Sequence, residues 1–191
     1  GTDTENQLVD GDPCTDLVFL FARATSESGN VGTFVGEPVI AAMRQAVGAD
    51  KLLVQGLDYP AAGQGIPDGR VTSGESGGQM MFDLVNQAIS TCPNSLIALG
   101  GYSQGSGVVH VAAEMSGFPT SKINSVILTG DPYSNRTVGQ IPQAAVFDDC
   151  HCLDNVCNGT QAYFNVSPQH QDYNVDTQAL ANFVLQKAGL S

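Results

Sequence analysis

The chain has 191 residues and a mass of 19.9 kDa, with 42% hydrophobic and 14% charged residues, so we expect residues 1–191 to form a single domain around one core. Its formal net charge of -12 argues against nucleic acid or any other polyanion as a partner, and neutral substrates are expected. No apolar run approaches the length that spans a bilayer, which argues against membrane insertion.

The cysteines and sequons of the chain indicate a secreted protein. Its five cysteines, at positions 14, 92, 150, 152 and 157, form neither a CxxC pair nor a Cys/His spacing typical of structural zinc, so disulfides are expected and no metal. The spacing leaves open whether Cys150 or Cys152 bonds Cys157. Asn-x-Ser/Thr triplets begin at Asn135, Asn158 and Asn165, which favours glycosylation. No signal peptide is visible at the start, and we expect one to have been removed.

The first third of the chain predicts two strands with a helix between them. Residues 17–22 (LVFLFA) are apolar without alternation, which is typical of a strand buried on both faces of a parallel sheet. Residues 37–47 carry apolar side chains at helical spacing and are followed by Gly48, a common helix terminator. Residues 51–57 predict the second strand.

The remaining elements continue this alternation after the Gly/Pro/Ser-rich loop at residues 60–78. Helical spacing of apolar side chains marks residues 80–89, 106–115 and 176–189, and short apolar runs predict strands at 95–100, 123–128 and 144–147. Alternating strands and helices predict a three-layer α/β/α sandwich with a mostly parallel five-stranded sheet. The connections are too short for a cap domain, so a site at the strand ends is expected to be open to solvent.

One serine lies where such a fold places a catalytic nucleophile. Residues 101–105 read GYSQG, a G-x-S-x-G pattern between a predicted strand and a predicted helix, which is the context of a nucleophile elbow. The glycines allow strand and helix to pass closely, and the helix N-terminus favours developing negative charge beside Ser103. A serine hydroxyl needs a base to become a nucleophile.

The base and the acid are less sharply indicated. His110 lies two turns along the helix that follows Ser103 and points away from it, whereas His170 follows several candidate acids in the chain and is our choice of base over His151. Asp154, in the cysteine-bounded loop, is slightly preferred as the acid, and Asp131 at the end of a strand remains its rival.

Three segments of the sequence resemble the fungal cutinase family. They are residues 22–32 (ARATSESGNVG), the elbow at 100–105, and Cys150-x3-Asp154-x2-Cys157 followed by His170-x2-Tyr173. The resemblance covers nearly the whole chain and implies a small, lidless α/β-hydrolase. It also implies a triad of Ser103, Asp154 and His170, disulfides Cys14–Cys92 and Cys150–Cys157, and no counterpart for Cys152.

The resemblance implies further that Thr25 and the backbone amide of Gln104 form the oxyanion hole, although many relatives have serine where this chain has Thr25. The expected function is a secreted, monomeric serine esterase that hydrolyses aliphatic polyesters and short to medium acyl esters without metal or cofactor. Phe164, Val166 and residues 60–66 are candidates for the rim that binds the acyl chain. An acetylxylan esterase of the same fold and a catalytically silent polymer-binding protein are the alternatives.

Overall fold

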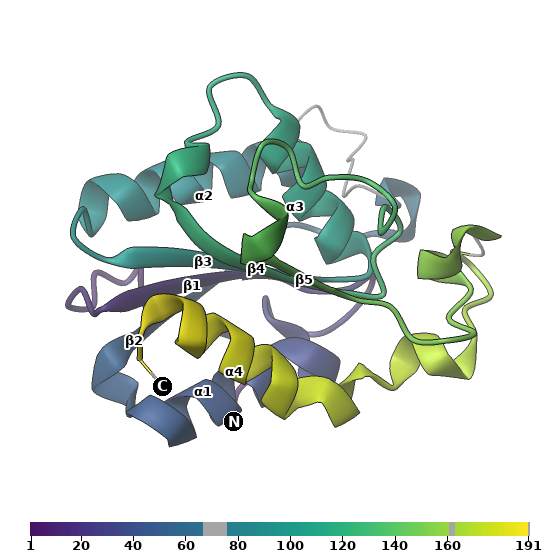
Figure 1. The fold of residues 1–191 in the computed structure, drawn as a ribbon, viewed down its shortest axis with the longest axis horizontal. Coiled ribbons are helices and arrows are strands. Elements are labelled where there is room, and N and C mark those ends of the chain that lie inside the picture. Colours follow the sequence, from purple (N-terminus) through teal and green to yellow (C-terminus); the bar gives the residue numbers. More distant parts are fainter. Residues whose placement is uncertain (67–75, 161–162, 191) are drawn as a thin grey trace.

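A five-stranded parallel sheet forms the centre of the protein, whose computed structural model describes residues 1–66, 76–160 and 163–190. The strands lie in the order β2-β1-β3-β4-β5, and every neighbouring pair is parallel, as Figure 1 shows. Their bounds are β1, Leu17–Ala22; β2, Leu52–Gly56; β3, Leu96–Tyr102; β4, Ile123–Thr129; and β5, Val146–Asp149. All six side chains of β1 are buried, as its uninterrupted apolar run predicts.

Two helices cover each face of the sheet (Figure 1). Helices α2 (Gly77–Thr91) and α3 (Gln104–Glu114) pack on one face, and α1 (Glu37–Val47) and α4 (Thr177–Ala188) pack on the other. Each interface encloses its own cluster of buried apolar side chains, so the sheet is covered on both sides. The prediction of a three-layer α/β/α sandwich with a five-stranded sheet is confirmed, and the sheet is parallel throughout.

Element boundaries differ from the predicted ones around the elbow, at the sheet edge and at α2, which spans Gly77–Thr91 where residues 80–89 were predicted as helix. Helix α3 begins at Gln104, two residues earlier than its apolar pattern indicates, and β3 runs on to Tyr102. Polar and glycine residues carry no hydrophobic signal, so the pattern missed both ends. Strand β5 starts two residues later than predicted because Ala144 and Ala145 lie in a short 3-10 helix, and it ends two residues later because its last two residues are aspartates. Only Ser103 therefore separates strand from helix.

The N-terminal segment covers the open edge of β2, a role that the sequence did not reveal. Asn6 and Gln55 form an antiparallel bridge, and the Gly56 amide donates to the Glu5 carbonyl at 2.9 Å. The Arg44 guanidinium of α1 binds both oxygens of the Glu5 carboxylate, at 2.6 and 2.9 Å. Such coverage removes backbone groups that an exposed edge strand would offer to another chain.

The cysteine pairing implied by the family resemblance is confirmed. Disulfides join Cys14 to Cys92 and Cys150 to Cys157, while Cys152 is a free, exposed thiol. The first bond ties the segment before β1 to the end of α2, and the second closes a short loop around Asp154. Within residues 1–66, 76–160 and 163–190, none of the helices combines the length and apolar character needed to cross a membrane.

Candidate active site

Ser103 occupies a strained turn that glycines make possible. Its backbone has φ 54° and ψ -117°, a conformation that non-glycine residues rarely adopt, and it lies between β3 and α3. A Cβ atom at Gly101 would lie 2.6 Å from the Gly105 carbonyl oxygen, and one at Gly105 would collide with the Ala22 carbonyl. Glycine at both positions is therefore required for the chain to turn this sharply and present the Ser103 hydroxyl at the edge of the sheet.

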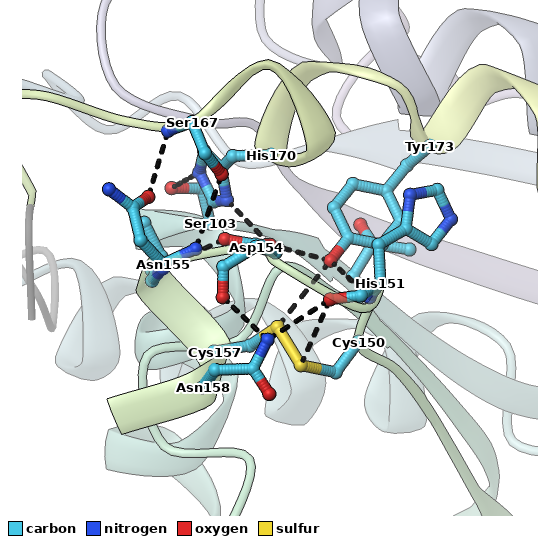
Figure 2. A network of polar contacts seen from close by, with 12 residues as sticks. Ser103, Cys150, His151, Asp154, Asn155, Cys157, Asn158, Ser167, His170 and Tyr173 are labelled. Atoms are coloured by element: carbon cyan, nitrogen blue, oxygen red, sulfur yellow. Dashed lines mark hydrogen bonds and ion pairs between the residues drawn. A yellow bond between two sulfur atoms is a disulfide. The ribbon is translucent and has the colours of Figure 1, made fainter. Parts of the chain in front are cut away.

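The structure brings Ser103, His170 and Asp154 together in one hydrogen-bonded chain (Figure 2). The Ser103 Oγ lies 2.8 Å from His170 Nε2, and His170 Nδ1 lies 2.9 Å from Asp154 Oδ2. Because an ionised carboxylate can only accept, Nδ1 carries the proton and Nε2 is left to accept from the serine hydroxyl. His170 is 4% exposed and Asp154 is fully buried, so solvent competes little for either contact.

Several donors keep Asp154 ionised despite its burial. Its Oδ2 accepts from the Tyr173 hydroxyl at 2.6 Å, and its Oδ1 accepts from the Val156 amide at 2.8 Å. Burial by itself would raise the pKa of Asp154, but hydrogen bonds from His170, Tyr173 and the Val156 backbone outweigh it and lower this pKa. The carboxylate is thus charged at neutral pH and can orient the imidazole and stabilise its protonated form.

Two asparagines fix the loops that carry the acid and the histidine. Asn158 Nδ2 donates to the backbone carbonyls of His151 and Asp154, at 3.1 and 2.7 Å, inside the disulfide-closed loop. Asn155 joins this loop to the segment before His170 (Figure 2). Its side-chain Oδ1 accepts from the backbone amide of Ser167 at 2.8 Å, and its backbone amide donates to Ser167 Oγ at 3.2 Å. Hydrogen bonds between these side chains and the backbone, together with the disulfide, thereby set the position of Asp154 relative to His170.

His170 also rests on residues to which sequence reasoning gave no role. The Tyr102 hydroxyl donates to the His170 carbonyl at 2.6 Å, and the imidazole lies so close to Gly130 that a Cβ there would be 2.7 Å from its Cε1. Tyr173 appeared in the sequence only as part of the family resemblance. Gly130 follows β4 and Tyr102 ends β3, so both positions could have been suspected from their proximity to the predicted strand ends.

Thr25 and Gln104 meet beside Ser103 as the resemblance implies. Gln104 Nε2 donates to Thr25 Oγ1 and to the Ala62 carbonyl, each at 3.0 Å. The Ala62 carbonyl can only accept, so the side-chain NH2 group of Gln104 must face it. The same NH2 group donates to Thr25 Oγ1, which is therefore an acceptor in this contact. Its hydroxyl hydrogen therefore remains free to donate elsewhere, and the Gln104 backbone amide begins α3 directly after the serine.

A carboxylate holds the loop that carries Thr25. Glu27 accepts from the backbone amides of Ala24, Thr33 and Phe34, at distances of 2.8 to 3.1 Å. Burial raises the pKa of Glu27, although these hydrogen bonds and the charge of Arg23 oppose the rise. The loop after β1 is thus folded around one side chain, which keeps Thr25 at the edge of the site.

The other histidines are separated from Ser103 and have their own carboxylate partners. His110 Nε2, on α3, lies 2.7 Å from Asp131 Oδ2, and both side chains are fully buried, so Asp131 is the partner of His110 and not of His170. His151 Nε2 lies 2.5 Å from Asp176 Oδ2. Together with Asp149, these two residues form the one His/Asp group in the described parts of the chain with ligand atoms close enough, within 4.8 Å of one another, to hold a metal ion.

A cavity of about 220 Å³ opens beside Ser103 and His170. Its lining includes Thr25 and the apolar surfaces of Phe34, Tyr163 and Val166. Of the residues expected at the rim, Val166 lines this cavity, whereas Phe164 does not line it, is 86% exposed and lies near Gly63. Residues 60–66 contribute the Ala62 carbonyl that anchors Gln104 and do not line the cavity.

A serine on a strand–turn–helix elbow, hydrogen-bonded to a histidine and a carboxylate at the carboxyl edge of a parallel sheet, defines a serine esterase of the α/β-hydrolase class. The family model "Cutinase" matches residues 13–188. The chain therefore belongs to the cutinase family of carboxylic ester hydrolases.

Curated relatives and solved structures agree with this assignment. The chain is 37% identical over 187 residues to a cutinase of Blumeria hordei, covering 96% of this chain and 75% of that one. It is 39% identical over 191 residues to cutinase 4 of Emericella nidulans, covering 100% and 79%. The structure of a Trichoderma reesei cutinase in complex with a phosphonate inhibitor superimposes with a TM-score of 0.82 at 35% identity, covering 98% of this chain and 80% of that chain. An acetylxylan esterase shares the fold, with a TM-score of 0.71 at 23% identity.

Proposed function

We propose that Ser103, His170 and Asp154 hydrolyse esters through an acyl-enzyme. His170 Nε2 takes the hydroxyl proton as Ser103 Oγ attacks the ester carbonyl carbon, and it then gives this proton to the departing alcohol oxygen as the carbon–oxygen bond breaks. Water, deprotonated by His170, releases the acid and regenerates the serine. The observation that carries the proposal is the unbroken chain of 2.8 and 2.9 Å contacts from Ser103 to Asp154.

The negative charge on the attacked carbonyl oxygen is stabilised in this proposal by the Gln104 amide and by Thr25. The support is that Gln104 opens helix α3 beside the nucleophile, and that its side chain leaves the Thr25 hydroxyl hydrogen free. Such donors act in a partly water-excluded site where developing charge is stabilised more strongly than in bulk water. No metal or cofactor takes part in the proposed steps.

The proposed substrates are aliphatic polyesters of the cutin type and soluble esters with short to medium acyl chains. The apolar surfaces of Phe34, Tyr163 and Val166 in the cavity suit an acyl chain, and a net charge of -12 suits a neutral substrate. Similarity to relatives named cutinase supports the same substrate class. Two disulfides fit an extracellular location, where we place this monomeric enzyme.

The test is a series of p-nitrophenyl esters from acetyl to long acyl chains, followed by acid release from an aliphatic polyester emulsion. Ser103→Ala serves as the blank, and Ser116→Ala, which changes an exposed serine, is the matched control. The proposal predicts Ser103-dependent rates that persist beyond acetyl, together with acid release from the polyester. Activity confined to acetyl esters would contradict the substrate assignment, and hydrolysis that survives in Ser103→Ala would contradict the mechanism.

A further inference from the structure

Tyr173 connects the proposed catalytic acid to a histidine outside the triad. Its hydroxyl donates to Asp154 Oδ2 at 2.6 Å and accepts from the backbone amide of His151 at 3.0 Å. The two rings are stacked, with centroids 4.1 Å apart and planes inclined by 27° (Figure 2). Tyr173 is 1% exposed, so its hydroxyl reaches Asp154 only through the position in which its surroundings hold the ring.

The surroundings of His151 favour its protonated form. Its Nε2 lies 2.5 Å from Asp176 Oδ2, at the start of α4. Partial burial by itself would lower the pKa of His151, but Asp176, the charge of Asp149 on β5 and the Gln169 backbone outweigh burial and raise this pKa. Because the Asp176 carboxylate is a hydrogen-bond acceptor with a negative charge, an imidazolium interacts with it more favourably than a neutral imidazole does.

These contacts place the imidazole of His151 on the face of the tyrosine whose hydroxyl binds Asp154. The charged and titratable groups around His151 are Asp149 from β5, Asp176 ahead of α4, Tyr173, and Asp154 beyond the tyrosine hydroxyl. The segment Tyr173–Asp176 therefore contacts the imidazole through both of its ends, with Asp176 bound to Nε2 and Tyr173 stacked against the ring. None of these contacts faces the cavity beside Ser103, whose lining does not include His151.

We propose that His151 is a positioning residue for the triad: held by Asp176 and stacked on Tyr173, it orients the Tyr173 hydroxyl toward Asp154. The inference rests on the proposed function, in which Asp154 is the catalytic acid. A cation on the ring face draws electron density from the phenol and makes its hydroxyl a stronger donor. A stronger donor stabilises the Asp154 carboxylate, and Asp154 then stabilises the protonated imidazole of His170 less strongly.

Loss of the His151 ring has two separable consequences. The pH midpoint of the acidic limb of kcat/KM moves upward, because Asp154 then stabilises the protonated form of His170 more strongly. We expect a shift of about half a pH unit, which lowers kcat/KM on that limb by about threefold. The plateau kcat falls severalfold because Tyr173 is less well oriented. KM stays unchanged, since His151 does not line the cavity.

The experiment compares His151→Gln with wild type, and uses Asp172→Asn as a matched control that removes an exposed charge nearby. Profiles of kcat and KM against pH on a p-nitrophenyl ester are recorded together with the titration of the His170 imidazole by NMR. Asp176→Asn retains the ring without its carboxylate partner and should shift the midpoint in the same direction, which keeps the test valid should His151→Gln fold poorly.

A double variant tests whether His151 acts through the tyrosine. In a Tyr173→Phe background, His151→Gln should produce little further shift, because the hydroxyl that carries the effect is gone. Superimposable profiles for His151→Gln and wild type, or an undiminished shift in the Tyr173→Phe background, would overturn the inference. The NMR titration reports on His170 without catalysis, so an inactive wild type would refute the proposed function while the positioning role is still tested.

Discussion

An alanine at Gly130 is expected to disable ester hydrolysis while leaving the fold intact. Gly130 follows β4, has φ +54°, and lies against the imidazole of His170, the proposed catalytic base. A Cβ atom built there would lie 2.7 Å from His170 Cε1, 2.8 Å from His170 Nδ1 and 3.1 Å from Tyr173 Cε2. Two of the three nearest atoms thus belong to the imidazole itself, so the ring is the group that must move.

The size of the effect follows from these distances. Ordinary contacts begin at 3.4 Å, so the imidazole must retreat by about 0.7 Å from an atom now 2.7 Å away. A comparable displacement of His170 Nε2 from Ser103 Oγ would lengthen their 2.8 Å contact to about 3.5 Å, beyond a useful hydrogen bond. Misplacement by about 1 Å costs on the order of 100-fold in rate, so we expect kcat to fall by about that factor with little change in KM.

The left-handed backbone adds a separate cost to stability. Alanine in that conformation costs about 1–2 kcal/mol, which corresponds to a decrease in Tm of a few degrees for a chain of this length. Gly189→Ala is the matched control, because Gly189 has φ +69° and a Cβ there would meet nothing within 4 Å. It should lower Tm similarly and leave kcat unchanged.

The assay is steady-state hydrolysis of a soluble p-nitrophenyl ester, with thermal melts of both variants. If Gly130→Ala kept the wild-type kcat, or if Gly189→Ala lost as much activity as Gly130→Ala, then the contact with His170 would not govern the rate. Either result would refute the geometric reasoning.

Three further predictions concern the oxyanion site, the acid and a buried carboxylate. Thr25→Ala should lower kcat by about 100-fold, whereas Thr25→Ser should retain most of it in the same ester assay. Asp154→Asn should lower kcat by about 10⁴-fold with KM little changed, because a neutral amide neither fixes the imidazole tautomer nor stabilises the imidazolium. Burial, with the charges of Asp131 and Asp149, raises the pKa of Asp148 to about 8. The folded state then keeps a proton that the unfolded state has lost, so stability declines as pH rises from about 4 to 8. Asp148→Asn should therefore raise Tm at pH 8 and not at pH 4, as thermal melts at both values would show; equal Tm values for variant and wild type at pH 8 would contradict this.

The framework of the fold could be predicted because its signals are local. The apolar run of β1 and the helical spacing ending at Gly48 each depend on a few neighbouring residues. The glycines around Ser103 mark the elbow because they lie between a predicted strand and a predicted helix. The N-terminal segment gave no such signal, since its role at the edge of β2 depends on contacts between Glu5 and Arg44, far apart in the chain.

The candidate site shows the same division. Ser103 was indicated by its motif, but chemistry in the sequence favoured Asp154 over Asp131 only slightly, because both are aspartates between the serine and His170. Geometry separates them: Asp131 binds His110 and Asp154 binds His170. The contacts of Gly130 and Tyr102 with His170 depend on how the ends of different strands lie in space, and the spacing of residues along the sequence does not indicate this.

The proposed hydrolysis requires Ser103 to act as a nucleophile activated by His170. Treatment with an organophosphate ester, followed by peptide mass spectrometry and residual esterase assays, tests this claim. We expect one phosphoryl adduct on the wild-type protein, at Ser103, with esterase activity lost in proportion to labelling. The His170→Ala variant should form no adduct under the same conditions. Full labelling of Ser103 with undiminished hydrolysis, or inactivation by an adduct elsewhere, would contradict it.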